Sequence, residues 1–304
     1  FVSCRACGHV LKCPHCDVSL SQHGSGAATR LVCHYCGYTT IQPGLCPVCG
    51  SKYISGFKAG TQKIEQVVKA RFPQARVLRM DMDTTRTKDG YEQILSAFSN
   101  HEADILIGTQ MIVKGHDFPG VTLVGVLAAD LSLYISDYRA SERTFQLLTQ
   151  AAGRAGRGDI PGNVIIQTYD PDHYSITTAK EQNYEAFYGQ EIEYRKMMRY
   201  PPVWNMLYIL CASKNEAAAS EAAVALMGKI DQIVRENSEK IFSIGPSDAP
   251  VAKISDVYRK VIYVKTREYQ TLVILKDDLE AFIKDNRLYQ NVAVGFDFNP
   301  VNGF

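Results

Sequence analysis

Eight cysteines in four CxxC pairs carry the clearest chemistry in this chain. The pairs are Cys4/Cys7, Cys13/Cys16, Cys33/Cys36 and Cys46/Cys49. A gap of two residues lets both sulfurs reach one tetrahedral ion, and two such pairs complete a four-sulfur zinc site that leaves no position for water. We therefore expect two structural zinc ions and no metal-activated nucleophile in this region.

Two other chemistries are open to CxxC pairs, disulfide formation and dithiol redox exchange. Disulfides need an oxidising compartment that this chain shows no sign of entering, and redox pairs rarely occur four at a time. Zinc binding is therefore the favoured interpretation of the four pairs. Four histidines lie among the cysteines but are surplus as ligands, and we expect them at the surface or beside the ligands: His9, His15, His23 and His34.

The pairing of the cysteines is open between two arrangements. A sequential arrangement joins the first two pairs and the last two. A nested arrangement joins the outermost pairs, Cys4, Cys7, Cys46 and Cys49, and the inner pairs, Cys13, Cys16, Cys33 and Cys36. Only five residues separate Cys7 from Cys13, which makes a sequential ribbon cramped and favours nesting.

Two further segments carry polar residues at informative spacings. One covers residues 108–119 and the other has the pattern Q-x-x-G-R-x-G-R over residues 150–157. In the second segment, small residues let the backbone approach a partner surface, while Arg154 and Arg157 project in the same direction along a helix. An arginine delivered to a γ-phosphate accelerates phosphoryl transfer by about 10³ to 10⁵. The alternative is an ordinary solvated, arginine-rich helix end.

The middle of the chain alternates short apolar strands with amphipathic helices. We expect strands near 53–57, 76–80, 104–108, 121–128 and 163–169, and helices near 61–72, 88–99 and 139–155. This alternation predicts an α/β lobe with a parallel sheet covered on both faces. Ligands of such sheets meet the loops at the carboxyl ends of the strands, where residues 108–119 begin.

A different pattern follows a charged helical stretch at 173–200, which Pro201-Pro202 should stop. We expect strands at 204–212, 241–245, 257–265 and 291–298 and helices at 215–236 and 270–286. The order βαββαβ predicts a ferredoxin-like α+β domain, in which Cys211 is a small buried hydrophobe. The chain thus divides into a cysteine-rich module (1–52), an α/β lobe (53–200) and an α+β domain (201–304).

Charge and hydropathy limit the function classes. Lys plus Arg (33) nearly equals Asp plus Glu (32), so any nucleic-acid contact must come from local patches. The longest uncharged apolar run, 121–129, is too short to span a membrane, and no signal peptide is recognisable. We expect a cytoplasmic protein with no membrane partner, and a chain opening with Phe1 is typical of an excised fragment.

The loop 245–253 and the residues after it form one local basic patch. Lys253, Arg259 and Lys260 could hold a DNA backbone or an acidic peptide tail, with Tyr258 as a stacking face. A solvated hairpin with its charges turned outward fits the pattern equally well.

Together these features resemble a known family. The arginine pattern, following G-T-Q-x-x-x-K-G-x-D-F in one α/β lobe, resembles the second RecA-like lobe of superfamily 2 helicases. Four CxxC pairs just before GTQKIE (60–65), then GTQMIVKGHDFPGVTLV (108–124) and QAAGRAGRG (150–158), resemble the PriA family of bacterial replication-restart DNA helicases over essentially the whole chain. The resemblance implies a cysteine-rich module inserted in the second lobe, with nested zinc pairing.

The resemblance also implies an activity and partners. These are ATP- and Mg²⁺-dependent 3′-to-5′ unwinding at stalled forks, and primosome assembly with single-stranded DNA-binding protein and other primosome proteins. The substrates would be DNA forks and single-stranded DNA, and the protein would act as a monomer. The family's C-terminal domain contacts DNA and the acidic tail of the single-stranded DNA-binding protein, which favours such a role for the basic patch.

Matching positions suggest individual roles. Gly108, Thr109, Gln110, Lys114, Gly115 and Asp117 match the motif that couples ATP to DNA contact, and Gln150, Gly153, Arg154 and Arg157 match the motif that completes the ATP site. Asp130 lies where such lobes place a coupling residue. The sequence departs from a complete helicase because it has no G-x-x-x-x-G-K-[ST] and no D-E-x-H. We expect no ATP hydrolysis by this chain alone, and the alternative is a zinc-stabilised module that binds DNA or primosome proteins by itself.

Overall fold

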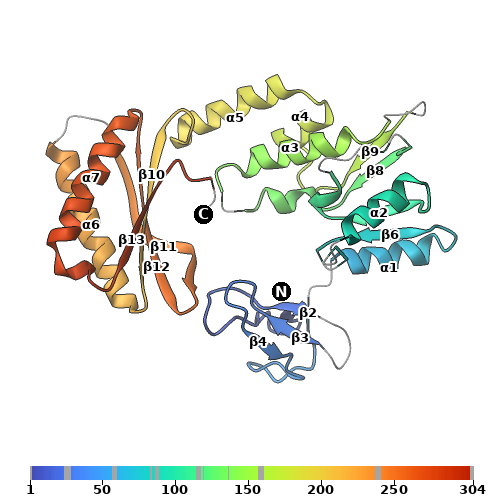
Figure 1. Ribbon diagram of the computed structural model, residues 1–304, viewed down its shortest axis with the longest axis horizontal. Coiled ribbons are helices and arrows are strands. Elements are labelled where there is room, and N and C mark those ends of the chain that lie inside the picture. The colour runs from blue at the N-terminus through green and yellow to red at the C-terminus, as the bar shows by residue number, and fades with distance from the viewer. Residues whose placement is uncertain are drawn as a thin grey trace. The chain divides into compact units, whose positions relative to one another are not determined.

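The computed structural model describes residues 2–23, 29–56, 60–82, 84–85, 89–113, 118, 120–135, 137–156, 161–236 and 241–301. The chain forms two compact units, of which the first joins Phe1–Phe57 to Ile192–Phe304 and the second is Lys58–Glu191 (Figure 1). The division into three domains at residues 52 and 200 stays a prediction. Among the described residues, no helix combines the length and apolar character that a membrane span requires.

The cysteine-rich part of the first unit is built from short antiparallel strands. β2 (Ser21–His23), β3 (Arg30–Val32) and β4 (Thr39–Ile41) form one sheet, and β1 (Val2–Cys4) pairs with β5 (Ile54–Gly56). A strand was expected at 53–57, but as part of the parallel lobe. The structure instead pairs it antiparallel with the first strand, so β5 closes the cysteine-rich module.

The rest of the first unit contains a four-stranded antiparallel sheet in the order β11-β12-β10-β13. The chain runs through β10 (Asn205–Ser213), α6 (Glu216–Glu236), β11 (Phe242–Ile254), β12 (Val257–Thr266), α7 (Tyr269–Asp285), the short helix η4 (Arg287–Tyr289) and β13 (Ala293–Phe298). This is the ferredoxin-like order that the βαββαβ pattern predicted. Helices α6 and α7 cover the sheet (Figure 1) and bury the side chains of Leu207, Ile209 and Leu226. Cys211 is fully buried there, as expected, and burial raises the pKa of its thiol to about 12.

The second unit has the expected alternation of strands and helices. Its elements are α1 (Thr61–Arg71), β6 (Val77–Met80), α2 (Gly90–Ser99), β7 (Ile105–Gly108), η2 (Gln110–Val113), β8 (Leu123–Val126), η3 (Ala129–Ser132), α3 (Ala140–Ala152), β9 (Asn163–Ile166) and α4 (Tyr174–Lys180). β6 pairs parallel with β7, and β8 pairs parallel with β9. In the described part of the chain these remain two separate pairs, where the sequence predicted one sheet.

Apolar packing holds the second unit around α3. Phe145 and Leu148 of α3 are buried with Ile176 of α4, and the ring of Phe145 stacks on that of Phe187 with centroids 4.2 Å apart. Phe187 lies on α5 (Tyr184–Met198), the helix that leads from the second unit into the first. The helix ends before Pro201-Pro202, as the sequence predicted.

Candidate metal centres and arginine motif

The eight paired cysteines lie in two groups of four. One group, called here the outer site, is Cys4, Cys7, Cys46 and Cys49, and the other, the inner site, is Cys13, Cys16, Cys33 and Cys36. Within each group all four sulfurs lie within 4.8 Å of one another. The structure therefore groups the cysteines in the nested arrangement.

The sulfur spacing fits zinc. Cys4 Sγ lies 3.6 Å from Cys49 Sγ, Cys7 Sγ lies 3.7 Å from Cys46 Sγ, and Cys13 Sγ lies 3.6 Å from Cys36 Sγ. A tetrahedral ion with Zn–S bonds of about 2.3 Å has S···S edges of about 3.8 Å, whereas a disulfide needs about 2 Å. The residues present therefore fit a four-sulfur zinc ion at each site.

Glycine closes three of the four cysteine turns. The amides of Gly8, Gly37 and Gly50 donate to the carbonyls of the first cysteine of their own pairs, at 3.0, 3.0 and 2.9 Å. Each glycine has a φ of +69° to +75°, the left-handed region that side chains rarely adopt. In the outer site, backbone N–H groups of Cys7 and Ala6 lower the pKa of the Cys4 thiol to about 6, which favours the thiolate that binds metal.

The arginine motif lies at the end of α3, beside the first motif. Gln150 is exposed on the last turn of α3, Gly153 follows the helix, and Arg154 is half-buried with its amide donating to Ala151 O at 3.1 Å. η2, which carries Gln110, packs against α3. The structure thus brings residues of both predicted motifs together in one lobe.

Gly108 allows a close approach at the carboxyl end of β7. A Cβ on this residue would lie 2.5 Å from Ile112 Cγ2 and 2.6 Å from Met80 O. Both distances are far below van der Waals contact, so any larger residue would push β7 away from β6 or from η2. Thr109 and Gln110, which follow, are exposed.

Four predicted residues, Lys114, Gly115, Asp117 and Arg157, lie outside the described residues. Asp130 is described and is 3% exposed. Its carboxylate accepts the Thr168 hydroxyl and the backbone N–H groups of Tyr169 and Asp170. The Thr168 hydrogen bond, with help from these amides, lowers the pKa of Asp130. Asp130 thus fixes the loop after β9, and its role as a coupling residue stays a prediction.

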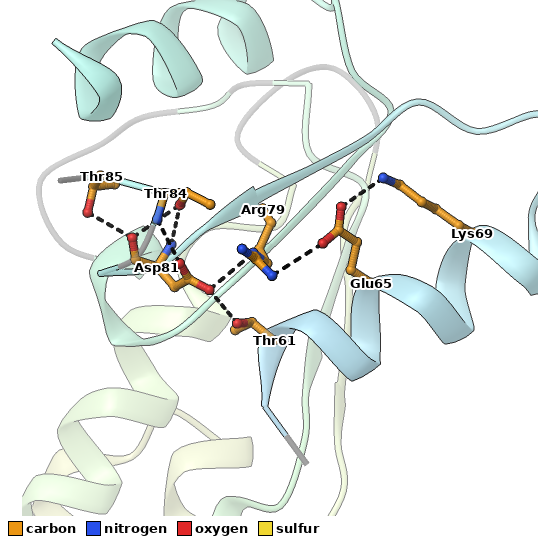
Figure 2. A network of polar contacts seen from close by, with 7 residues as sticks. All are labelled: Thr61, Glu65, Lys69, Arg79, Asp81, Thr84 and Thr85. Atoms are coloured by element: carbon orange, nitrogen blue, oxygen red, sulfur yellow. Dashed lines mark hydrogen bonds and ion pairs between the residues drawn. The ribbon is translucent and has the colours of Figure 1, made fainter. Parts of the chain in front are cut away.

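A polar network that the sequence did not predict anchors the start of α1 (Figure 2). Asp81, which follows β6, accepts from the Thr61 hydroxyl at 2.5 Å and lies 3.1 Å from Arg79 Nε. Arg79 also lies 3.5 Å from Glu65, which pairs with Lys69 at 2.7 Å. The network joins the GTQKIE segment to the carboxyl end of β6, the edge where ligands of parallel sheets bind. Arg79 and Asp81 are two residues apart, so in an extended segment their side chains point to the same face. This spacing was the signal in the sequence that could have indicated their ion pair.

The three basic residues of the C-terminal patch all have partners within the first unit. Lys253 Nζ donates to Pro14 O at 2.8 Å, and Lys260 Nζ pairs with Asp248 at 2.5 Å. Arg259 Nη1 donates to Val251 O at 3.3 Å. Their predicted contact with DNA or a partner stays a prediction.

Three family models match the chain in succession. They are the PriA DNA helicase Cys-rich region domain over residues 13–40, the helicase conserved C-terminal domain over 52–159, and the primosomal protein N C-terminal domain over 196–301. The first covers the inner-site cysteines, and the second covers the Gly108 loop and the whole arginine motif.

Curated relatives align with nearly all of the chain. It is 46% identical over 302 residues to the replication restart protein PriA of Bacillus subtilis, with 99% of this chain covered but 37% of the relative. It is 44% identical to the replication restart protein PriA of Synechocystis (90% of this chain, 33% of the relative) and 35% identical to that of Borreliella burgdorferi (99% and 44%). The chain spans less than half the length of each of these relatives. Through its Cys-rich region, helicase C-terminal domain and primosomal C-terminal domain, this chain belongs to the PriA family.

Proposed function

We propose that the chain supplies the zinc-binding module, second motor lobe and C-terminal domain of an ATP-dependent 3′-to-5′ DNA helicase that restarts replication at stalled forks by primosome assembly. The packing of η2 against α3 carries this proposal, because it joins the Gly108 loop to the arginine motif. Such a protein would work on DNA in the cytoplasm. Because the chain spans 37% of the Bacillus subtilis relative, the activity is proposed for a longer protein.

In this proposal the nucleotide is shared between two lobes. ATP with Mg²⁺ would supply the phosphoanhydride bond whose hydrolysis drives unwinding. Arg154 and Arg157 would neutralise charge on the γ-phosphate, with Gln150 and Gly153 shaping the helix end that presents them. Residues 108–110, with Lys114, Gly115 and Asp117, would pass the nucleotide state to the DNA.

The zinc sites have a structural role in this proposal. Four sulfurs fill each tetrahedral shell, so no position is left for water or substrate. Structural zinc contributes on the order of 10–16 kcal/mol to the folding of small modules. Two zinc ions would therefore hold strands β1 to β5, which bury few large side chains of their own.

DNA and proteins of the primosome are the proposed partners. Lys253, Arg259 and Lys260 could contact a DNA backbone or the acidic tail of single-stranded DNA-binding protein. Each would have to share or leave its internal partner to do so, because all three side chains are engaged in the free chain.

Arginine substitutions in the full-length protein test the proposal. We expect Arg157→Ala to abolish DNA-stimulated ATP hydrolysis and Arg154→Ala to reduce it by at least tenfold, with DNA affinity unchanged. Arg71→Ala is the matched control, because Arg71 is an exposed arginine at the end of α1 and belongs to neither motif. Normal turnover in both motif variants, or ATP hydrolysis by residues 1–304 alone, would overturn the proposal.

A further inference from the structure

One of the four cysteine turns differs from the others. Gly8, Gly37 and Gly50 follow the second cysteine of their pairs, but Asp17 follows Cys16. Asp17 does not adopt the positive φ of the glycines, and its amide does not return to the carbonyl of its own turn. It donates instead to Lys253 O at 2.8 Å. The turn of the inner site that lacks a glycine is thus closed by a segment more than 230 residues away.

That segment is the tip of the β11–β12 hairpin. The amide of Ser255 donates to Cys16 Sγ at 3.2 Å, and the amide of Asp256 donates to His15 O at 2.9 Å. Side chains add two contacts, because Lys253 Nζ donates to Pro14 O at 2.8 Å and His15 Nδ1 lies 2.7 Å from Asp256 Oδ2. Every residue from Pro14 to Asp17 therefore contacts the hairpin.

Apolar packing accompanies these hydrogen bonds. Ile254, the last residue of β11, packs against the buried cluster of the cysteine-rich module, which includes Cys13, Cys16 and Leu20. The backbone contacts of the outer site lie within the module itself, since Arg5 N donates to Tyr53 O and Cys4 N donates to His9 O. The hairpin's hydrogen bonds and the side chain of Ile254 therefore meet the inner-site turn.

The turn at the tip has a sequence poorly suited to its conformation. Ser255 and Asp256 have φ values of 51° and 61°, the pattern of a two-residue turn that favours Asn-Gly. Non-glycine residues in this region store strain that surrounding contacts must offset. The contacts of Ser255 and Asp256 with the Cys16 turn are such contacts, and Asp256 supplies one that glycine could not make.

We propose that the β11–β12 hairpin is part of the inner zinc site: the Ser255 amide donates to a ligand sulfur, so zinc binding at the inner site and hairpin docking stabilise each other. Four thiolates around Zn²⁺ carry a formal charge of −2, and hydrogen bonds from N–H groups stabilise that charge and orient the ligands. A ligand that binds the docked form better must, by linkage, favour docking. The inference rests on the zinc assignment of the proposed function.

Zinc release from residues 1–304 tests this coupling. Ile254→Asp places a charge in the docking contact, and Ile244→Asp is the matched control on the same strand, at a side chain 53% exposed. Each protein is first assayed for zinc, then mixed with excess EDTA while iodoacetamide labels freed cysteines for mass spectrometry. We expect Ile254→Asp to accelerate labelling of the four inner cysteines at least tenfold, while the outer four and the control stay at the wild-type rate.

A second variant guards against misfolding of the first. Ser255→Asn with Asp256→Gly gives the turn its favoured sequence and removes the contacts of the Asp256 carboxylate with His15 and Lys253, so inner labelling should rise a few-fold with the hairpin intact. In wild type, zinc removal should raise amide hydrogen exchange at Ser255 and Asp256 but not in β10.

The outcomes distinguish failure of the proposed coupling from failure of the zinc assignment. Two zinc ions per chain with inner labelling unchanged in both hairpin variants, or with inner and outer labelling accelerated equally, would overturn the coupling alone. Fewer than two zinc ions in the wild type would overturn the zinc assignment itself.

Discussion

Replacing Asp81 by alanine should destabilise the second unit far more than a typical surface substitution. The Asp81 carboxylate accepts hydrogen bonds from the Thr61 hydroxyl at 2.5 Å and the Thr84 amide at 3.0 Å, and it forms an ion pair with Arg79, whose Nε lies 3.1 Å away (Figure 2). The side chains of Asp81 and Arg79 are only 12% and 14% exposed, so water cannot fully replace the lost partner. Arg79 would keep one carboxylate, Glu65 at 3.5 Å.

The size of the loss follows from these contacts. The Asp81 carboxylate is charged, so its hydrogen bonds from Thr61 and Thr84 each contribute about 1.5–3 kcal/mol, and their loss costs about 3–6 kcal/mol before the ion pair with Arg79 is counted. For a unit of this size that corresponds to a decrease in melting temperature of about 10 °C or more. Calorimetry should show the lobe transition lowered by this amount. Trp204, the chain's single tryptophan, lies in the first unit, so its fluorescence emission should report an unchanged unfolding transition of that unit.

Asp104→Ala is the matched control for this prediction. Asp104 also pairs with an arginine of the same lobe, Arg76 at 2.8 Å, but both side chains are about half exposed. Exposed ion pairs contribute little, so the control should move the lobe transition much less. Equal shifts for Asp81→Ala and Asp104→Ala would refute the argument that burial of the network, and not the count of its bonds, sets its contribution.

Two other predictions follow from single residues. Gly108→Ala should destabilise the lobe by about 1–3 kcal/mol because its Cβ would overlap Ile112 and Met80 O, whereas Gly125→Ala on β8 meets open space and should be near neutral in urea denaturation. Burial, with the nearby charge of Arg199, lowers the pKa of Lys265 to about 8. Between that value and the unfolded value of about 10.4 the unfolded chain binds more protons, so stability rises with pH. The urea midpoint of Trp204 emission should therefore rise from pH 8 to 10 in the wild type and stay flat in Lys265→Met; a wild-type midpoint that fell would contradict the burial argument.

Local patterns predicted most of the fold. The ferredoxin-like domain formed as expected because each strand and helix has its own hydrophobic period and short loops join them, so element order alone restricts the topology. The strand at 53–57 shows where this reasoning fails. Its residues form β5, but a three-residue strand does not encode its partner, and β1 at the other end of the module was the available edge.

Polar networks were the part of the site that could not be predicted. The arginine motif and the cysteine pairs have fixed spacings in sequence, so they could be found without coordinates. Arg79 and Asp81 are two residues apart, but Thr61 comes from a different element whose position relative to them depends on packing, and no spacing links it to them. The same holds for Asp130, whose partners in residues 168–170 follow a different strand.

The hairpin contact with the inner site has a signal in the sequence, but only when two observations are combined. An Asp where three equivalent turns have Gly marks a turn that cannot close on itself, and a Ser-Asp tip in a tight hairpin marks a turn held by something outside it. Neither observation names a partner, because many contacts could relieve either defect. In the structure the two turns contact each other, because the Asp17 amide donates to Lys253 O and the Ser255 amide donates to Cys16 Sγ. Each irregular turn therefore explains the other. It follows that replacing Asp17 by glycine should let the Cys16 turn close on its own carbonyl, as the three glycine turns do. The release of zinc from the inner site should then depend less on the hairpin.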